Sequence, residues 1–182
     1  ESADEDAAVE IVHNSKVQRP SVCNALETLL VHESAAERLL PPVLARLRAS
    51  GVTIHADDRT MAIFADAVPV VEEDWSTEHM SLDLSVKVVA GLDEAMDHIH
   101  RYSTHHTESI ITNDLANAER FLNEVDSAVV MVNTSTRFTD GGQFGFGAEV
   151  GISTQKLHAR GPMGLPELTS TTWVVTGNGQ IR

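Results

Sequence analysis

The chain alternates short apolar runs with longer segments of helical periodicity, and this alternation constrains the fold more than any other feature of the sequence. The runs occupy residues 27–31, 52–55, 86–90, 109–112 and 128–132, and each has the length of a buried strand. Strands that are joined through helices need crossover connections, which favour parallel pairing. The sequence therefore predicts an α/β domain with three αβα layers around a mainly parallel sheet.

Amphipathic segments between these runs predict the helices. They are expected at residues 4–17, 34–50, 59–65, 92–102 and from Asn113 or Asp114 to about 123. Ser34 and Glu37 have the spacing of a capping box at the start of the second helix. Pro41 and Pro42 lie inside that helix, so we expect it to break or restart there.

The chain changes character after residue 132. Residues 133–168 are rich in Gly, Ser and Thr and are too long for an ordinary connector, which is typical of a functional or disordered segment. Residues 172–176 (TWVVT) are expected to form a last strand. We therefore expect residues 1–168 to form one cysteine-bearing α/β domain, and residues 169–182 to be a strand segment for linking or oligomerisation.

Composition makes several classes of protein unlikely. The chain has 13 Lys and Arg against 27 Asp and Glu, a net charge of −14, so nucleic acids and anionic membrane surfaces are unfavourable partners. One cysteine allows neither an internal disulfide nor a cysteine-cluster zinc site, and is typical of a reducing, cytoplasmic compartment. The acidic start without an initiator Met leads us to expect a piece of a longer protein.

Cys23 is the first candidate for chemistry. It follows Pro20 and Ser21, which favour a loop or turn. Lys16 and Arg19 are close in sequence, and nearby cations favour the nucleophilic thiolate. The alternative is a small buried side chain, which is the commoner role of a lone cysteine.

Other motifs are weaker signals. Nine histidines show no metal-binding spacing, so we expect no metal site and interpret them as surface or helix-end residues. The glycines at 145 and 147 resemble a nucleotide-binding loop only superficially. The glycines at 141, 142, 145 and 147 are better explained by a close approach of the backbone to another segment or to a ligand.

Two basic, turn-forming clusters are candidates for anion binding. Ser135 and Arg137 follow the fifth run, and the carboxyl ends of parallel strands are common ligand positions. Arg137 could bind a carboxylate or phosphate through two hydrogen bonds. Arg160 lies in a second such cluster. An ordinary polar loop with a surface arginine is an equal alternative for the first cluster.

Several long motifs together resemble one family. They are KVQRPSVCN (16–24), the segment 89–110, VNTSTRFTDGGQFGFGAEVGIST (132–154) and KLHARGPMGL (156–165). In this order they are similar to the C-terminal, cysteine-bearing half of the γ-glutamyl phosphate reductase family, within the aldehyde dehydrogenase superfamily. The resemblance implies the catalytic domain of that fold, with an N-terminal NADP-binding domain that is absent from this chain.

The resemblance also implies a reaction and roles for residues. The family reduces L-glutamate 5-phosphate to L-glutamate 5-semialdehyde and phosphate with NADPH, in proline biosynthesis. Cys23 would be the nucleophile, passing through a thioester and a thiohemiacetal. Ser135 and Arg137 would bind the glutamyl tail. Arg19 and Arg160 would support the phosphate or the thiolate, and Glu78 would contact the cofactor.

Partners and alternatives follow from the same resemblance. We expect a homo-oligomer and glutamate 5-kinase as an upstream partner. The superfamily takes an oxyanion-hole Asn from its N-terminal half, so the isolated chain is expected to be inactive. The alternatives are a related acylating aldehyde dehydrogenase with another acyl donor, such as an acyl-CoA, and a non-catalytic α/β assembly module.

Overall fold

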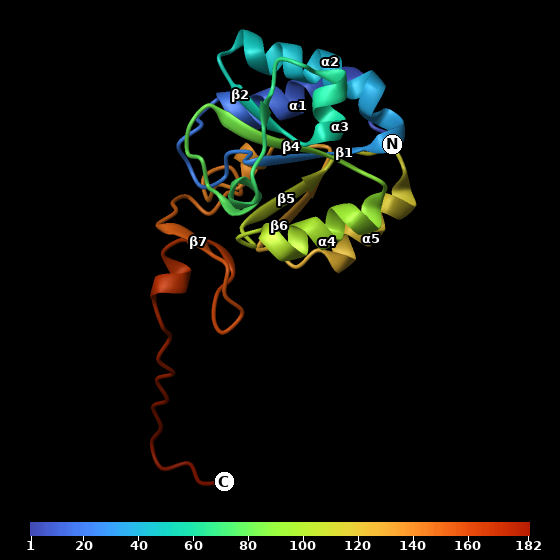
Figure 1. The fold of residues 1–182 in the computed structure, drawn as a ribbon. Coiled ribbons are helices and arrows are strands. Elements are labelled where there is room, and N and C mark those ends of the chain that lie inside the picture. The colour runs from blue at the N-terminus through green and yellow to red at the C-terminus, as the bar shows by residue number, and fades with distance from the viewer.

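A four-stranded parallel sheet forms the centre of the computed structural model, which describes residues 1–182 (Figure 1). Its strands are β1 (Thr28–His32), β2 (Thr53–Ala56), β3 (Val68–Pro69) and β4 (Asp83–Val89). Their order is β1-β4-β2-β3, and every pairing is parallel. Strands β1, β2 and β4 coincide with predicted apolar runs to within a few residues, whereas the two-residue β3 was not predicted.

Two smaller sheets complete the strands. β5 (Thr107–Ile110) pairs with β6 (Val129–Val132) in parallel, as the sequence predicts. β7 (Gly151–Ser153) and β8 (Gly161–Met163) form an antiparallel pair. This last pair lies inside the segment that was expected to be irregular. It was not predicted, because strands of three residues are too short to show an alternating pattern in the sequence.

Helices cover both sides of the strands. The α-helices are α1 (Glu5–Val17), α2 (Glu33–Ala49), α3 (Asp58–Ile63), α4 (Leu92–Tyr102) and α5 (Leu115–Glu124), and short 3₁₀ turns lie at η1 (Glu72–Ser76), η2 (Thr136–Phe138) and η3 (Pro166–Leu168). In Figure 1, α1 and α2 lie on one side of the strands, with α4 and α5 on the other. This confirms the three-layer αβα prediction.

Helix α2 continues through both of its prolines, so the predicted break at Pro41 and Pro42 is wrong. A proline leaves the carbonyl four residues earlier without its helical donor. Those carbonyls belong to Glu37 and Arg38, and both residues are exposed. Water can satisfy them, so the helix loses two hydrogen bonds on its solvent face without breaking.

The helix caps are partly as predicted. Asp114 Oδ1 accepts a hydrogen bond from the Asn117 amide (3.0 Å), which confirms a cap at the start of α5. The predicted Ser34 cap of α2 is displaced. His32 is the N-cap instead, and its Nδ1 accepts a hydrogen bond from the Ser34 amide (3.1 Å). An imidazole can fill this place because its nitrogen lone pair accepts like a hydroxyl oxygen.

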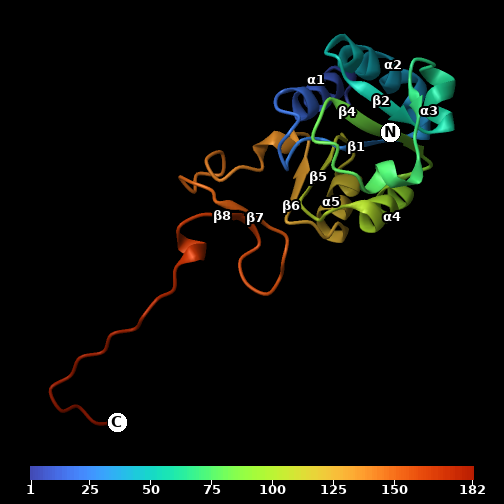
Figure 2. The ribbon, with the colours of Figure 1, turned by 60° about the vertical axis from the view of Figure 1, so that its left-hand side comes forward.

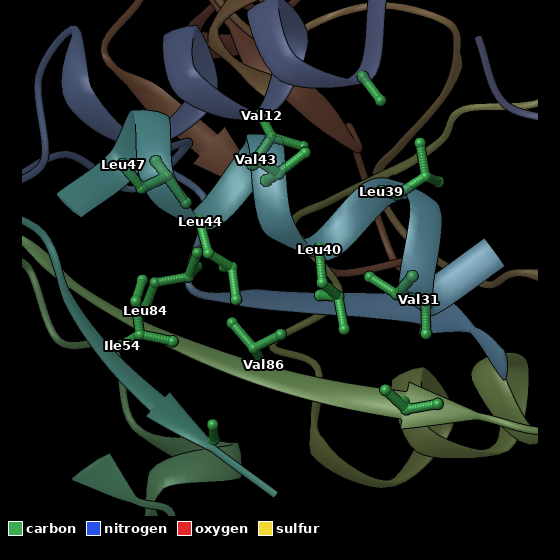
Figure 3. Packing of buried hydrophobic residues seen from close by; sticks show 14 of the residues in the cluster. Val12, Val31, Leu39, Leu40, Val43, Leu44, Leu47, Ile54, Leu84 and Val86 are labelled. Carbon is green, nitrogen blue, oxygen red and sulfur yellow. The ribbon is translucent and has the colours of Figure 1, made fainter. Parts of the chain in front are cut away.

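The core lies between α2, α1 and the main sheet (Figure 3). Leu40, Leu44 and Leu47 recur at spacings of three and four along α2, and all three are fully buried. They face Leu84 and other apolar side chains of the sheet. Burying a leucine removes its apolar surface from water and stabilises the fold by about 1.5–3 kcal/mol per side chain.

The C-terminal segment does not form the expected strand. Residues 172–176 are extended but pair with no other strand, and Trp173 and Val175 are more than nine-tenths exposed. Figures 1 and 2 show this segment running away from the α/β body. The prediction of a strand is wrong for this chain. A strand needs a neighbouring strand to pair its backbone hydrogen bonds, and the side-chain pattern of the segment does not show whether such a neighbour exists. Linking or oligomerisation stays a prediction for residues 169–182.

None of the helices combines the length and the apolar character that crossing a membrane requires.

The packing of α2 predicts a measurable loss of stability. Leu44→Ala should lower the free energy of unfolding in urea by about 2–5 kcal/mol, because the cavity is left against the sheet. Leu157→Ala is the matched control: Leu157 is 94% exposed, so its effect should stay within about 0.5 kcal/mol. Equal effects of the two substitutions would contradict this description of the core.

Candidate active site

Cys23 is exposed in the loop that joins α1 to β1, as its turn-forming neighbours predict. Two contacts close this loop at its base. The Leu26 amide donates a hydrogen bond to the Ser15 carbonyl (3.0 Å), and Lys16 Nζ donates to Glu27 Oε2 (2.9 Å). The cysteine is therefore presented on a short loop whose two ends are held together.

Lys16 has a structural role instead of the expected electrostatic one. Its side chain is fully buried and paired with Glu27, and burial lowers the pKa of its ammonium group. The paired carboxylate neutralises the charge that was expected to favour the thiolate. Arg19 is exposed and makes no hydrogen bond or ion pair, so it remains available to a ligand.

The segment after β6 returns along β5 toward the strand's amino end. Asn133 exchanges two hydrogen bonds with the backbone of Thr112, beyond the carboxyl end of β5. Six residues later, Thr139 Oγ1 accepts a hydrogen bond from Thr107, the first residue of β5 (2.9 Å). The sequence-based analysis placed this segment at the carboxyl ends of the strands, but its later residues lie at the amino ends, where Cys23 also lies.

Hydrogen bonds attach the returning segment to the cysteine loop. Thr136 Oγ1 donates to the Asn24 carbonyl (2.7 Å), and Asn24 Nδ2 donates to the Thr139 carbonyl (2.9 Å). Ser15 Oγ donates to Ser135 Oγ (3.0 Å), and both serines are buried. These contacts bring the predicted residues Ser135 and Arg137 to the vicinity of Cys23.

Arg137 is held with part of its guanidinium free. Its Nε donates to Gln18 Oε1 (2.8 Å), and its amide donates to Ser135 Oγ (3.2 Å). The terminal nitrogens of the guanidinium make no other hydrogen bond in the chain. Ser135 Oγ accepts two hydrogen bonds and still has its own proton to donate. Arg137, whose charge acts on the thiol of Cys23, can therefore donate to an anionic group, and the buried hydroxyl of Ser135 keeps one proton to donate.

The thiol of Cys23 is not shifted toward the thiolate, contrary to the sequence-based expectation. Partial burial raises its pKa most, and the negative charges of Glu149 and Glu78 raise it further. Arg137 acts in the opposite direction. In the chain alone the cysteine is therefore a thiol at neutral pH.

Glu149 is a site residue that the sequence analysis missed. Its Oε2 accepts a hydrogen bond from the Gly141 amide (2.8 Å). A Cβ at Gly141 would lie 2.8 Å from the Ala148 carbonyl oxygen, and one at Gly164 would lie 2.9 Å from the same atom. The predicted close approach of the glycine-rich segment is thus confirmed at Gly141. This close packing holds the loop that carries Glu149 in place.

Glu78 lies in the connection between η1 and β4. It is exposed, and its carboxylate makes no hydrogen bond in the chain. The Met80 amide donates to Glu27 Oε1 (3.3 Å), so the connection is attached to the carboxylate that also binds Lys16. Glu78 and the cysteine loop are therefore positioned by a shared anchor.

A cleft of about 440 Å³ separates β1 from β5 and includes the cysteine. Near Cys23 its lining is polar and comprises Asn24, Glu78, His106, Thr107 and Thr136. Further from Cys23 it is lined by apolar residues of α1, α2 and α4. Apolar clefts with a few convergent polar groups are typical ligand sites.

Arg160 is not attached to the cysteine loop. Its Nη1 donates to Asp126 Oδ1 (2.7 Å), at the amino end of β6. Lys156 and Arg160 together lower the pKa of Asp126 to about 2. The guanidinium that was predicted to support phosphate is thus occupied by an ion pair, so the geometry gives Arg160 a structural role.

No group of three or more His, Cys, Asp or Glu side chains could hold a metal ion.

Comparison with known proteins gives a consistent result, although no family model matches the chain. The chain is 71% identical to the γ-glutamyl phosphate reductase of Leifsonia xyli, and 65% identical to that of Thermobifida fusca, over its whole length. The crystal structure of the Thermotoga maritima γ-glutamyl phosphate reductase matches all of it, with 53% identity and a TM-score of 0.94. Over its whole length the chain is thus similar to one part of the γ-glutamyl phosphate reductases. It spans only 43–44% of the length of these relatives.

More distant structures support the fold alone. An acetylating aldehyde dehydrogenase from Geobacillus thermoglucosidasius is 18% identical, has a TM-score of 0.58 and matches 79% of this chain. The predicted α/β fold with a mainly parallel sheet is therefore also found in an aldehyde dehydrogenase.

The anchor of the cysteine loop can be tested by removing one partner. Lys16→Met should lower the free energy of unfolding by about 3–5 kcal/mol, because it leaves the Glu27 carboxylate without its cation. The double variant Lys16→Met/Glu27→Leu should lose less in urea denaturation. Arg48→Met, which breaks an exposed pair with Asp66, is the control and should cost about 0–1 kcal/mol. A double variant as unstable as Lys16→Met would contradict the account.

The charges around the thiol can be tested by alkylation. Glu149→Gln should lower the pKa of Cys23, so its alkylation by iodoacetamide should reach half-maximal rate at a lower pH; Arg137→Gln should shift it to higher pH. Glu167→Gln is the matched control, because Glu167 also accepts a glycine amide (2.8 Å) but does not act on the thiol. Rates would be read by mass spectrometry of the Cys23 peptide from the full-length protein. Unchanged profiles in both charge variants would contradict this assignment.

Proposed function

We propose that this chain is the cysteine-bearing catalytic part of an enzyme that reduces L-glutamate 5-phosphate to L-glutamate 5-semialdehyde and phosphate with NADPH, in proline biosynthesis. The observation that carries the proposal is the placement of Cys23. It is exposed in a loop anchored at both ends, at a polar end of a cleft, with a positively charged side chain and two carboxylates around it. Proteins to which it is similar are named γ-glutamyl phosphate reductase, which supports the proposal.

The thiol supplies a nucleophile that an acyl phosphate requires. The Cys23 sulfur attacks the γ-carbonyl carbon, its proton leaves, and the carbon–oxygen bond to phosphate breaks with the electron pair on phosphate. The product is a thioester, whose carbonyl carbon accepts a hydride while its oxygen takes a proton from water, which gives a thiohemiacetal. The hydroxyl of that intermediate then loses its proton as the carbon–sulfur bond breaks, releasing the aldehyde and the thiolate.

Positive groups near Cys23 match the anionic parts of the substrate. Binding of the phosphate next to the sulfur favours expulsion of the leaving group, and we assign this to Arg19, which has no partner in the chain. The free nitrogens of Arg137 and the hydroxyl of Ser135 bind the α-carboxylate in this proposal. Arg137 also opposes the carboxylates that raise the pKa of Cys23.

The residues present fit a nicotinamide cofactor on one side of the cleft. Glu78 lines the cleft, and its unpaired carboxylate can accept hydrogen bonds from ribose hydroxyls. NADPH, when bound, supplies the hydride that reduces the thioester carbonyl. We propose that most of its binding surface comes from the part of the protein outside this chain. A homo-oligomer and supply of the labile acyl phosphate by glutamate 5-kinase belong to the same proposal.

The reverse reaction tests this function directly. Full-length protein with L-glutamate 5-semialdehyde and phosphate should reduce NADP⁺, and Cys23→Ser should abolish the reaction, because serine is a far weaker nucleophile at neutral pH. Equal rates in the two proteins would remove Cys23 from the mechanism. No phosphate-dependent rate in the wild type would favour another acyl donor or a non-catalytic module.

A further inference from the structure

Two buried hydrogen-bonding atoms close to Cys23 have no partner in the chain. They are Asn24 Oδ1 and His106 Nε2. Both residues line the cleft that contains Cys23, and Asn24 is only 7% exposed; His98, whose Nε2 also lacks a partner, lines the same cleft. Buried polar atoms in folded proteins are almost always hydrogen-bonded, so the atoms beside Cys23 need a partner that this chain does not itself supply.

The hydrogen bonds around His106 show that its free nitrogen is an acceptor. Thr107 Oγ1 gives its proton to Thr139 Oγ1 (2.9 Å), so it can only accept from His106 Nδ1 (2.7 Å). Nδ1 therefore carries the hydrogen of the neutral ring, and Nε2 carries a lone pair. Burial lowers the pKa of His106, which keeps the ring neutral at pH 7.

The same hydrogen bonds join His106 to Asn24. His106 is bonded to Thr107, and Thr107 donates to the hydroxyl of Thr139. The carbonyl of the same Thr139 accepts a hydrogen bond from Asn24 Nδ2 (2.9 Å). With its amide nitrogen used in this way, Asn24 presents its Oδ1, which is also an acceptor. The unpartnered atoms are thus two acceptors that are oriented by one shared anchor.

The local charge favours a cation at these acceptors. Glu78 and Glu149 are the two charged groups that act on His106, and both also act on Cys23. The positive charge of Arg137 acts on Cys23 in the opposite direction. The site is therefore polarised, with acceptors and negative charge near His106 and donors with positive charge near Arg137.

We propose that Asn24 Oδ1 and His106 Nε2 bind the α-ammonium group of the substrate. This inference rests on the proposed function, and it extends it by naming how the amino acid is recognised. An ammonium group has three donors and a positive charge, so its chemistry matches two neutral acceptors in an acidic surrounding. With the α-carboxylate at Arg137 and Ser135, the zwitterion is oriented along the polarity of the site.

The test compares substrates with and without the amino group. In full-length protein with NADP⁺ and phosphate, kcat/KM is measured for L-glutamate 5-semialdehyde and for 5-oxopentanoate, which lacks only the amino group. His106→Phe and Asn24→Leu should each lower the value for the amino substrate about tenfold, since each loses one charged hydrogen bond. The value for 5-oxopentanoate should stay unchanged. His106→Gln, which keeps an acceptor, should retain part of the preference.

His98 offers a matched control. Its Nε2 is also buried without a partner, and burial lowers its pKa to about 4, but it packs against Trp75 and Tyr102. His98→Phe should therefore leave the ratio of the two kcat/KM values unchanged.

Each result decides the question. Equal losses on both substrates in His106→Phe would overturn the ammonium site while leaving the Cys23-dependent reaction intact. If Asn24→Leu does not fold, which circular dichroism would show, the two His106 variants still decide. No phosphate-dependent reduction of NADP⁺ by the wild type with either substrate would overturn the proposed function, and the ammonium site with it.

Discussion

The buried ion pair between Lys16 and Glu27 determines where the cysteine lies. Lys16 lies in the last turn of α1 and Glu27 directly precedes β1, so this contact of 2.9 Å helps to hold the two ends of the loop together. Glu27 also accepts the Met80 amide, which attaches the connection that carries Glu78. Removing one partner of a buried ion pair leaves the other charge unpaired and lowers the stability strongly. We therefore expect single substitutions of Lys16 or Glu27 to be poorly tolerated. The remaining site geometry is built on this pair.

The second determinant is the path of the chain after β6. Residues 133–139 return along β5 and meet the cysteine loop through paired hydrogen bonds between Asn24, Thr136 and Thr139. This return brings donors to one side of the thiol, while Glu78 and Glu149 supply negative charge. The cysteine therefore lies between opposite charges, an arrangement that suits a zwitterionic substrate, and the raised pKa of its thiol reflects the acidic side.

Much of the fold could be predicted from the sequence because its determinants are local. The apolar runs of β1, β4 and β6 are readable one by one, and Leu92–Tyr102 forms its helix with the predicted bounds. The continuity of α2 was not predictable from its prolines, because it depends on which face of the helix meets water. The unpaired segment 172–176 depends on a strand partner, about which its own residues carry no information.

The site was predictable only in part, for the same reason. The exposed loop position of Cys23 could be predicted from its turn-forming neighbours, and its role as nucleophile stays a prediction. The roles predicted for Lys16 and Arg160 from their charge did not anticipate their ion pairs. Lys16 pairs with Glu27 across the cysteine loop, and Arg160 pairs with Asp126, which lies 34 residues earlier in the chain. Asn24, His106 and Glu149 were missed, since their roles depend on contacts across more than 30 residues or on the path of a glycine-rich segment.

The central claim is that Cys23 forms a covalent acyl intermediate. The most direct measurement is rapid mixing of full-length protein with NADP⁺ and L-glutamate 5-semialdehyde without phosphate, recording absorbance of NADPH. The account predicts a burst of one NADPH per chain, because the thioester forms once and waits for phosphate. A steady rate without a burst, or a burst that survives Cys23→Ser, would contradict it.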